Sequence, residues 1–291
     1  MQLLPENGGC QTIHDSFHRQ LKSNMVFASI LTYLGLQKNH HTLVHSAYRK
    51  IRAVFPDLTI EQLIRELQQR VGSEGSVIMP AFTYCFKKST GEYEIFDPAN
   101  SPSKVGAVSE VFRKWPGIIR TSSPTHSFSL WGQAAREIAA TNSPASPLGK
   151  GSVLDWLHQQ PDAHILLLGV NFTAMSFCHF LEVKAPVPWA DFSPWDHLHV
   201  LKIGVSIHGE QRLKEVPGCS KSFVNFERYL VENEIIKPFE YNSLSVYYFP
   251  VKTIYEAGLK YFRNHFQNLI CPAGTCPACD SRRRVYLEKN K

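Results

Sequence analysis

Two groups of side chains in this sequence have types and spacings that could do chemistry. In the first, His179 and Glu182 are three residues apart and follow an apolar run at residues 165–168. Thr173 could cap a helix that places Ser176, His179 and Glu182 on one face. A neutral imidazole held by a carboxylate can accept a proton from an attacking amine. A core histidine bonded to a backbone carbonyl, beside a surface carboxylate, is the competing interpretation.

The second group is Cys271, Cys276 and Cys279, of which the last two have C-x2-C spacing. Thiolates at this spacing, with Pro and Gly in the turns, suit tetrahedral Zn²⁺, and Cys219 is a candidate fourth ligand. An unligated reduced cluster and a redox or disulfide pair are the alternatives. Because so short a segment cannot build a core, we expect it to need a cross-link and to form a unit apart from any catalytic site.

Buried strands and amphipathic helices alternate along the chain and must position these residues. Apolar residues at helical spacing predict helices at residues 15–35, after Thr59, and at 254–266. Near-continuous or alternating apolar runs predict strands at residues 42–46, 76–80, 118–120, 164–170, 201–207 and 244–251. The pattern indicates an α/β fold with a mostly parallel central sheet flanked by helices, a strand-rich C-terminal part and a Cys-containing tail. Functional residues in such sheets collect where the strands end.

No linker rich in Pro, Gly or Ser divides the chain, so we predict one domain over residues 1–270 and a Cys-rich basic tail over 271–291. With 43% hydrophobic residues, the 291 residues can bury a substantial core. The 31 Lys and Arg against 25 Asp and Glu give a modest net charge of +6. Without a basic segment interleaved with aromatic residues, nucleic acid is not an expected partner. The run Arg282-Arg283-Arg284 is interpreted as a solvated tail.

Membrane insertion and secretion are not expected. No uninterrupted apolar run approaches the roughly 18 residues that span a bilayer, and residues 1–10 lack the basic and apolar regions of a signal peptide. We therefore expect a cytoplasmic protein whose seven cysteines are reduced or metal-bound.

Four segments carry a resemblance to a known family. They are residues 43–46 (LVHS), 75–83 (GSVIMPAFT), 96–128 (from FDPANSPSKVG to PTHSF) and 166–182. Their order and spacing resemble the aminoglycoside 3-N-acetyltransferase, or antibiotic N-acetyltransferase, family over about the first two-thirds of the chain. The family's last motif reads Gly-Val-x-x-Asp-x-x-Thr-x-x-His-x-x-Glu. His179 and Glu182 match it, whereas Thr173 and Ser176 replace its Asp and Thr.

The resemblance implies an acetyl-coenzyme A-dependent N-acetyltransferase with His179 as general base and Glu182 supporting it. His45 and Ser46 match the family's His-Ser-Ser, with Ala47 in place of the second Ser. His45 is thereby assigned to the coenzyme A site, where Ser46 and Thr83 would donate to the thioester or pantetheine arm. Hydroxyls bonded to their own backbone are the alternative for both residues.

Further coenzyme A contacts are implied at Ser127 and Lys150. Ser127 matches the family, and a helix beginning near Phe128 would present free amides to the acyl carbonyl or a phosphate. Lys150 is a candidate phosphate ligand, against the alternative of a plain surface lysine.

The resulting hypothesis is direct acyl transfer to an amine of an amino sugar or aminoglycoside-like acceptor, with Thr173 and Ser176 at the acceptor. The expected partners are this amine and coenzyme A, with a homodimer left open. The family's Asp would place a negative charge beside the amine, so Thr173 favours an acceptor other than a polycationic drug. The alternatives are a noncatalytic binding or scaffold relative, and a cysteine nucleophile at Cys178 or Cys85. Neighbours on a helix point about 100° apart, which argues against a Cys178–His179 pair.

Overall fold

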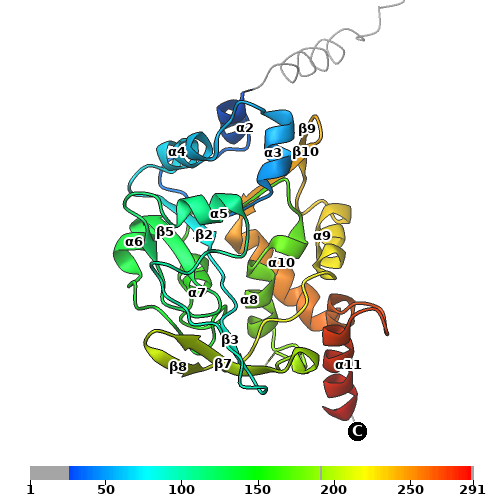
Figure 1. The fold of residues 1–291 in the computed structure, drawn as a ribbon. Coiled ribbons are helices and arrows are strands. Elements are labelled where there is room, and N and C mark those ends of the chain that lie inside the picture. Colours follow the sequence, from blue (N-terminus) through cyan, green and yellow to red (C-terminus); the bar gives the residue numbers. More distant parts are fainter. Residues whose placement is uncertain (1–25, 191, 290–291) are drawn as a thin grey trace, which may run out of the picture.

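A seven-stranded sheet forms the centre of the computed structural model, which describes residues 26–190 and 192–289 (Figure 1). Its strand order is β4-β5-β2-β1-β6-β10-β9. The three central strands are parallel, namely β2 (Ser76–Pro80), β1 (His41–Ser46) and β6 (Ala163–Leu168). Antiparallel strands extend both edges, namely β5 (Phe128–Gly132) and β4 (Ile119–Arg120) beyond β2, and β10 (Leu244–Pro250) and β9 (Phe239–Tyr241) beyond β6. The predicted α/β class and parallel centre are confirmed.

Both faces of the sheet are covered, which explains why its central strands are apolar throughout. Successive side chains of each strand point to opposite faces of the sheet and enter two cores. Leu43 and Ile165 face one core, and Val44 and Leu166 face the other. The first core lies under α6 (Gln133–Glu137), α7 (Val153–His158), α8 (Phe177–Lys184), α9 (Phe223–Glu232) and α10 (Val251–Asn264). The second lies under α2 (Phe27–Tyr33), α3 (Tyr48–Val54), α4 (Ile60–Val71) and α5 (Ala107–Phe112). The first half of the predicted helix at 15–35 lies outside the described residues.

Local sequence sets the ends of α4, the helix predicted after Thr59. The Thr59 hydroxyl accepts a hydrogen bond from the amide of Gln62, whose side chain accepts one from the Thr59 amide, forming a capping box. Gly72 ends the helix at φ 68°, a conformation that favours glycine. The buried stripe of Leu63, Leu67 and their neighbours then fixes the helix against the sheet.

A second sheet lies beside the C-terminal ends of the central strands. It contains β3 (Phe86–Lys88), β7 (Val200–Ser206) and β8 (Gly209–Arg212), all antiparallel. The strands predicted at 201–207 and 244–251 are confirmed as β7 and β10. No helix of the described residues is long and apolar enough to cross a membrane.

The C-terminal segment folds against the rest of the molecule. Short 3-10 turns η2 (Asp196–Leu198) and η3 (Phe266–Leu269) precede α11 (Pro277–Lys289), and Tyr286 of α11 packs edge-on against Phe266 (Figure 1). The interpretation of residues 282–284 as a solvated tail is wrong for Arg282, which is 3% exposed, although Arg284 is exposed.

Candidate functional site

The loops that follow the three parallel strands enclose a main cavity of about 640 Å³. His45 and Ser46 come from the end of β1, Phe82 follows β2, and His179 belongs to the segment after β6. Parallel strands bring their carboxyl ends to one edge of the sheet, which is why residues distant in sequence meet here. The remaining wall comes from the second sheet and residues 217–221.

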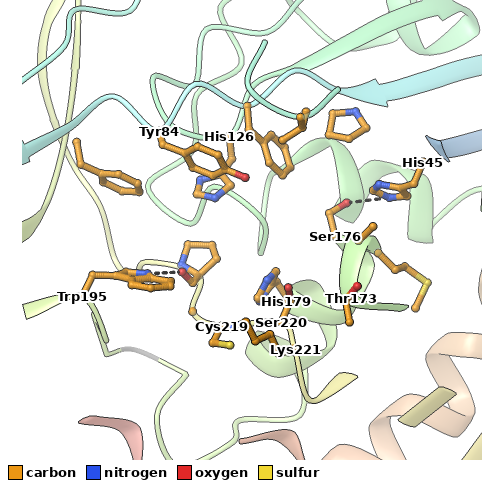
Figure 2. A pocket seen from close by; sticks show the side chains of 18 of the residues that line it. His45, Tyr84, His126, Thr173, Ser176, His179, Trp195, Cys219, Ser220 and Lys221 are labelled. Atoms are coloured by element: carbon orange, nitrogen blue, oxygen red, sulfur yellow. Dashed lines mark hydrogen bonds between the residues drawn. The ribbon is translucent and has the colours of Figure 1, made fainter. Parts of the chain in front are cut away.

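His179 and Glu182 form a hydrogen-bonded pair on α8. Nδ1 of His179 lies 2.7 Å from Oε2 of Glu182, and the two side chains are 12% and 5% exposed. A carboxylate can only accept, so we assign the ring proton to Nδ1, which leaves Nε2 as the acceptor. The ring packs edge-on against Phe223 and lies at the cavity wall (Figure 2). The predicted pair is therefore brought together.

Close packing holds α8 in place behind this pair. A Cβ added to Gly258 of α10 would lie 2.5 Å from Leu181, so only glycine allows α10 to approach so closely. Helix α8 begins at Phe177 after Ser176, while Thr173 lies in the separate 3-10 turn η1 (Phe172–Ala174). The prediction of Thr173 as a helix cap is wrong, because Asn171 caps η1.

Glu182 lies among groups that stabilise its charge. Burial opposes ionisation, but the Arg282 cation at 3.1 Å and the bond from His179 together hold the pKa of Glu182 below its usual range. The indole of Trp189 donates a further hydrogen bond at 3.3 Å. The carboxylate is thus ionised at neutral pH and can hold the imidazole.

Two further histidines lie at the cavity wall and are neutral at physiological pH. Burial lowers the pKa of His45 and of His126 to about 3. Nε2 of His45 lies 3.4 Å from the Ser176 hydroxyl (Figure 2). These rings supply hydrogen-bonding positions without charge.

The other residues implied by the resemblance divide into two sets. His45, Ser46, Thr173 and Ser176 line the main cavity together with His179. Thr83, Ser127 and Lys150 do not belong to that wall.

Thr83 and Ser127 are committed to the fold. The Thr83 hydroxyl donates to the Pro124 carbonyl at 2.8 Å, and that of Ser127 donates to the Ala81 carbonyl at 2.8 Å. Lys150 is exposed in the turn before α7. The predicted helix near Phe128 is wrong, because this segment is strand β5. Its conformation is set by pairing with β2, which is distant in the sequence.

An aromatic wall went unpredicted. Tyr84, Phe86 and Trp195 line the cavity, with Tyr84 and His126 opposite His179 (Figure 2). Tyr84 is 44% exposed and has φ 55°, a left-handed conformation uncommon outside glycine and often found at functional sites. Phe86 belongs to the second sheet, whereas Tyr84 and Trp195 lie in loops, and no local motif marks these segments as parts of one site.

The four predicted cysteines form one cluster. Their Sγ atoms all lie within 4.8 Å of one another, and those of Cys219 and Cys271 are 3.8 Å apart. Sulfurs bound tetrahedrally at about 2.3 Å from zinc lie about 3.8 Å apart, whereas a disulfide needs about 2.05 Å. The donors therefore fit zinc. The three cysteines of the C-terminal segment lie outside the lining of the main cavity, whereas Cys219 is part of that lining, so the cluster borders the other site.

Two isolated cysteines have surroundings that disfavour a nucleophile. Burial raises the pKa of Cys85, and burial followed by the charges of Glu182 and Glu227 raises that of Cys178 well above its usual range. A thiol must ionise to attack, so neither residue is activated.

Comparison with known proteins gives consistent matches. The sequence profile of the aminoglycoside 3-N-acetyltransferases matches residues 43–263. Aminoglycoside N(3)-acetyltransferase IV of Salmonella sp is 30% identical over 209 residues, which are 71% of this chain and 74% of that protein. The crystal structure of apo aminoglycoside acetyltransferase AAC(3)-IVa has a TM-score of 0.74 at 25% identity, covering 89% of this chain and 95% of that one. The AAC-IIIb binary structure with CoASH has the same fold, with a TM-score of 0.64 at 19% identity over 81% and 94% of the two chains. The chain belongs to the aminoglycoside 3-N-acetyltransferase family and is an acyltransferase.

Proposed function

We propose that this protein transfers the acetyl group of acetyl-coenzyme A directly to an amine of an amino sugar or aminoglycoside-like acceptor. The observation that carries this proposal is the pair of His179 and Glu182 at 2.7 Å, at the wall of a cavity of about 640 Å³. Membership of this family supports acetyl-coenzyme A as the acyl donor, and so does the binary complex of AAC-IIIb with CoASH.

In the proposed reaction, His179 acts as general base. Glu182 holds Nδ1–H, so Nε2 accepts the amine proton as the amine nitrogen bonds to the thioester carbonyl carbon. The tetrahedral intermediate then collapses with cleavage of the C–S bond, and the thiolate leaves and takes a proton. The products are an amide and free coenzyme A. Direct transfer is supported by the burial of Cys85 and Cys178.

The donor is proposed to enter past Ser46, which the main cavity shares with a neighbouring hollow of about 650 Å³. Arg49 and Arg52 line this hollow, so their charges suit the phosphates of coenzyme A. His45 and Ser46 would then lie near the thioester. We propose that the phosphates lie there rather than at Lys150, which lines neither of the two cavities.

The acceptor is proposed to lie against the aromatic wall, with Thr173 and Ser176 near its amine. Aromatic faces attract ammonium groups and cover the apolar face of a sugar ring. Lys221, which also lines the main cavity, disfavours a densely charged polycation. We therefore propose an acceptor with few amino groups.

Tyr84→Ala should raise the KM for the acceptor about fivefold, the worth of one exposed ammonium–aromatic contact of about 1 kcal/mol. The KM for acetyl-coenzyme A should stay unchanged. Tyr93, which is 52% exposed and outside the cavity lining, provides the matched control Tyr93→Ala. Equal acceptor KM values for the two variants would remove Tyr84 from the acceptor site.

Glu182→Gln keeps the shape of the side chain and one acceptor oxygen but removes the charge. The low pKa of Glu182 means that this charge is present throughout the pH range where the rate rises. We expect a rate loss of about tenfold, the worth of one pKa unit, and a rising limb of the pH–rate profile at lower pH because the imidazolium loses an anion. An unchanged profile with weaker acceptor binding would instead place Glu182 on the acceptor.

We also propose that Cys219, Cys271, Cys276 and Cys279 hold one Zn²⁺. Zinc at this site would cross-link the loop before α9 to the start of α11. None of the described cysteines forms a disulfide, which supports a cytoplasmic location. That the protein forms a homodimer stays a prediction, which its sedimentation in the ultracentrifuge would test.

A thermal-shift titration with acetyl-coenzyme A tests the function. At 100 times its dissociation constant, the ligand should add about 2.7 kcal/mol and raise Tm by about 5 °C. Coenzyme A without the acetyl group should shift Tm similarly, and ATP should shift it less. No shift at millimolar acetyl-coenzyme A would favour the noncatalytic alternative.

A further inference from the structure

Arg282 of the C-terminal helix reaches the catalytic pair of α8. Its Nη2 lies 3.1 Å from Oε1 and 3.3 Å from Oε2 of Glu182, whose Oε2 is the atom bonded to His179. The side chains of Arg282 and Glu182 are 4% and 5% exposed. A contact this well buried is only weakly screened by solvent, so its charge acts strongly on Glu182.

The guanidinium lies in a closely fitted space. It lies 5.7 Å from the centroid of the Trp189 ring, and its Nη1 donates to the Cys219 carbonyl at 3.2 Å. A Cβ added to Gly218 would come within 2.2 Å of Nη2. Only glycine at position 218 therefore leaves room for Arg282 on Glu182.

The cysteine cluster lies on both sides of this contact. Cys276 immediately precedes α11, the helix that carries Arg282, and Cys279 lies in its first turn, while Cys219 follows Gly218 in the loop that covers Arg282. Since all four sulfurs lie within 4.8 Å, a bound metal would fix helix and loop to each other. Cys279 and Arg282 are three positions apart on α11, so less than one helical turn connects the two features.

We propose that Arg282 is a positioning residue for the His179–Glu182 pair and that a metal-loaded cysteine cluster holds it in place. Its catalytic meaning rests on the proposed function. Arg282 keeps Glu182 charged and oriented, and Glu182 in turn orients the imidazole. Loss of metal would release α11 and withdraw the cation from the pair.

The other titratable groups near the pair are few among the described residues. His126 faces His179 across the cavity and is neutral at physiological pH. Glu215 lines a small cavity behind His179 with Glu182 and Arg282, and accepts a hydrogen bond from Ser146. Lys221 also lines the main cavity with His179, but the cation in contact with Glu182 is Arg282, so its removal should raise the proton affinity of the pair.

The test compares three variants by pH–rate profile and by NMR titration of the His179 ring, whose signal is the one missing from His179→Ala. Arg282→Met removes the cation. Gly218→Ala keeps every charge but displaces the guanidinium. Arg284→Met is the matched control, because Arg284 is an exposed arginine of the same helix and donates a hydrogen bond to Ser281.

Arg282→Met and Gly218→Ala should both move the rising limb and the ring titration to higher pH, by about one unit for Arg282→Met. This direction is opposite to that of Glu182→Gln, and Arg284→Met should match the wild type. Superimposable titrations for all three variants would overturn the proposal. If Arg282→Met does not fold, Gly218→Ala decides. Because the ring titration needs no turnover, a wild type without transferase activity would refute the proposed function while leaving this test intact.

The metal link has its own measurement. Stripping the metal with a chelator should move the ring titration of the wild type to higher pH and leave that of Arg282→Met unchanged. An unmoved wild-type titration after complete metal loss, or a protein that binds no metal, would overturn the cluster's part in the proposal.

Discussion

His179→Ala is expected to lower kcat by about 10²- to 10⁴-fold, the usual worth of a positioned general base. Alanine removes the imidazole that Glu182 orients toward the cavity, and burial makes His45 and His126, which also line it, weak bases that cannot replace His179. The rate is measured as thiol release from acetyl-coenzyme A. The Tm shift with acetyl-coenzyme A should persist, because the imidazole acts on the acceptor.

Cys178→Ala provides the control for this variant. Cys178 neighbours His179 but is fully buried in the core, so its loss should cost stability and little activity. A folded but inactive Cys178→Ala protein, beside an active His179→Ala protein, would reinstate the thiol mechanism.

Cys279→Ser is expected to produce the largest loss of stability. The four cysteines should hold about one equivalent of zinc, and loss of a structural metal costs more than about 4 kcal/mol. A protein of this size should then lose about 10 °C in Tm. Metal content by mass spectrometry and Tm by calorimetry measure both effects.

Cys85→Ser is the matched control, since Cys85 is a buried cysteine outside the cluster. It should keep the metal. Purified protein that contains no metal and has the same Tm with and without a chelator would contradict the zinc proposal.

Local features were predictable from the sequence. The capping box at Thr59, the apolar strand β6 and the i, i+3 spacing of His179 and Glu182 depend on neighbours along the chain, and the structure has all three. Features set by distant partners were not predictable. Strand β5 is fixed by pairing with β2, and Arg282 is buried by a carboxylate 100 residues away.

The cavity shows the same division. His45 and Ser46 were found because they resemble the family's His-Ser-Ser motif, at the end of a strand whose apolar run is visible. Tyr84 and Trp195 were not assigned to the site because they lie in loops, after β2 and before η2, that no sequence motif marks. Thr83 and Ser127 carry suitable hydroxyls, but each hydroxyl donates to a backbone carbonyl that the sequence does not identify.

The most direct test of the central claim is a single incubation of the enzyme with isotopically labelled acetyl-coenzyme A and a panel of amino sugars, followed by mass spectrometry of protein and small molecules. Wild-type enzyme should yield an acceptor one acetyl group heavier on nitrogen, with no acetylated protein at any time. His179→Ala should yield neither. Label that accumulates on a cysteine would contradict direct transfer by His179. Amino sugars that stay unlabelled although the enzyme binds acetyl-coenzyme A would contradict this class of acceptor.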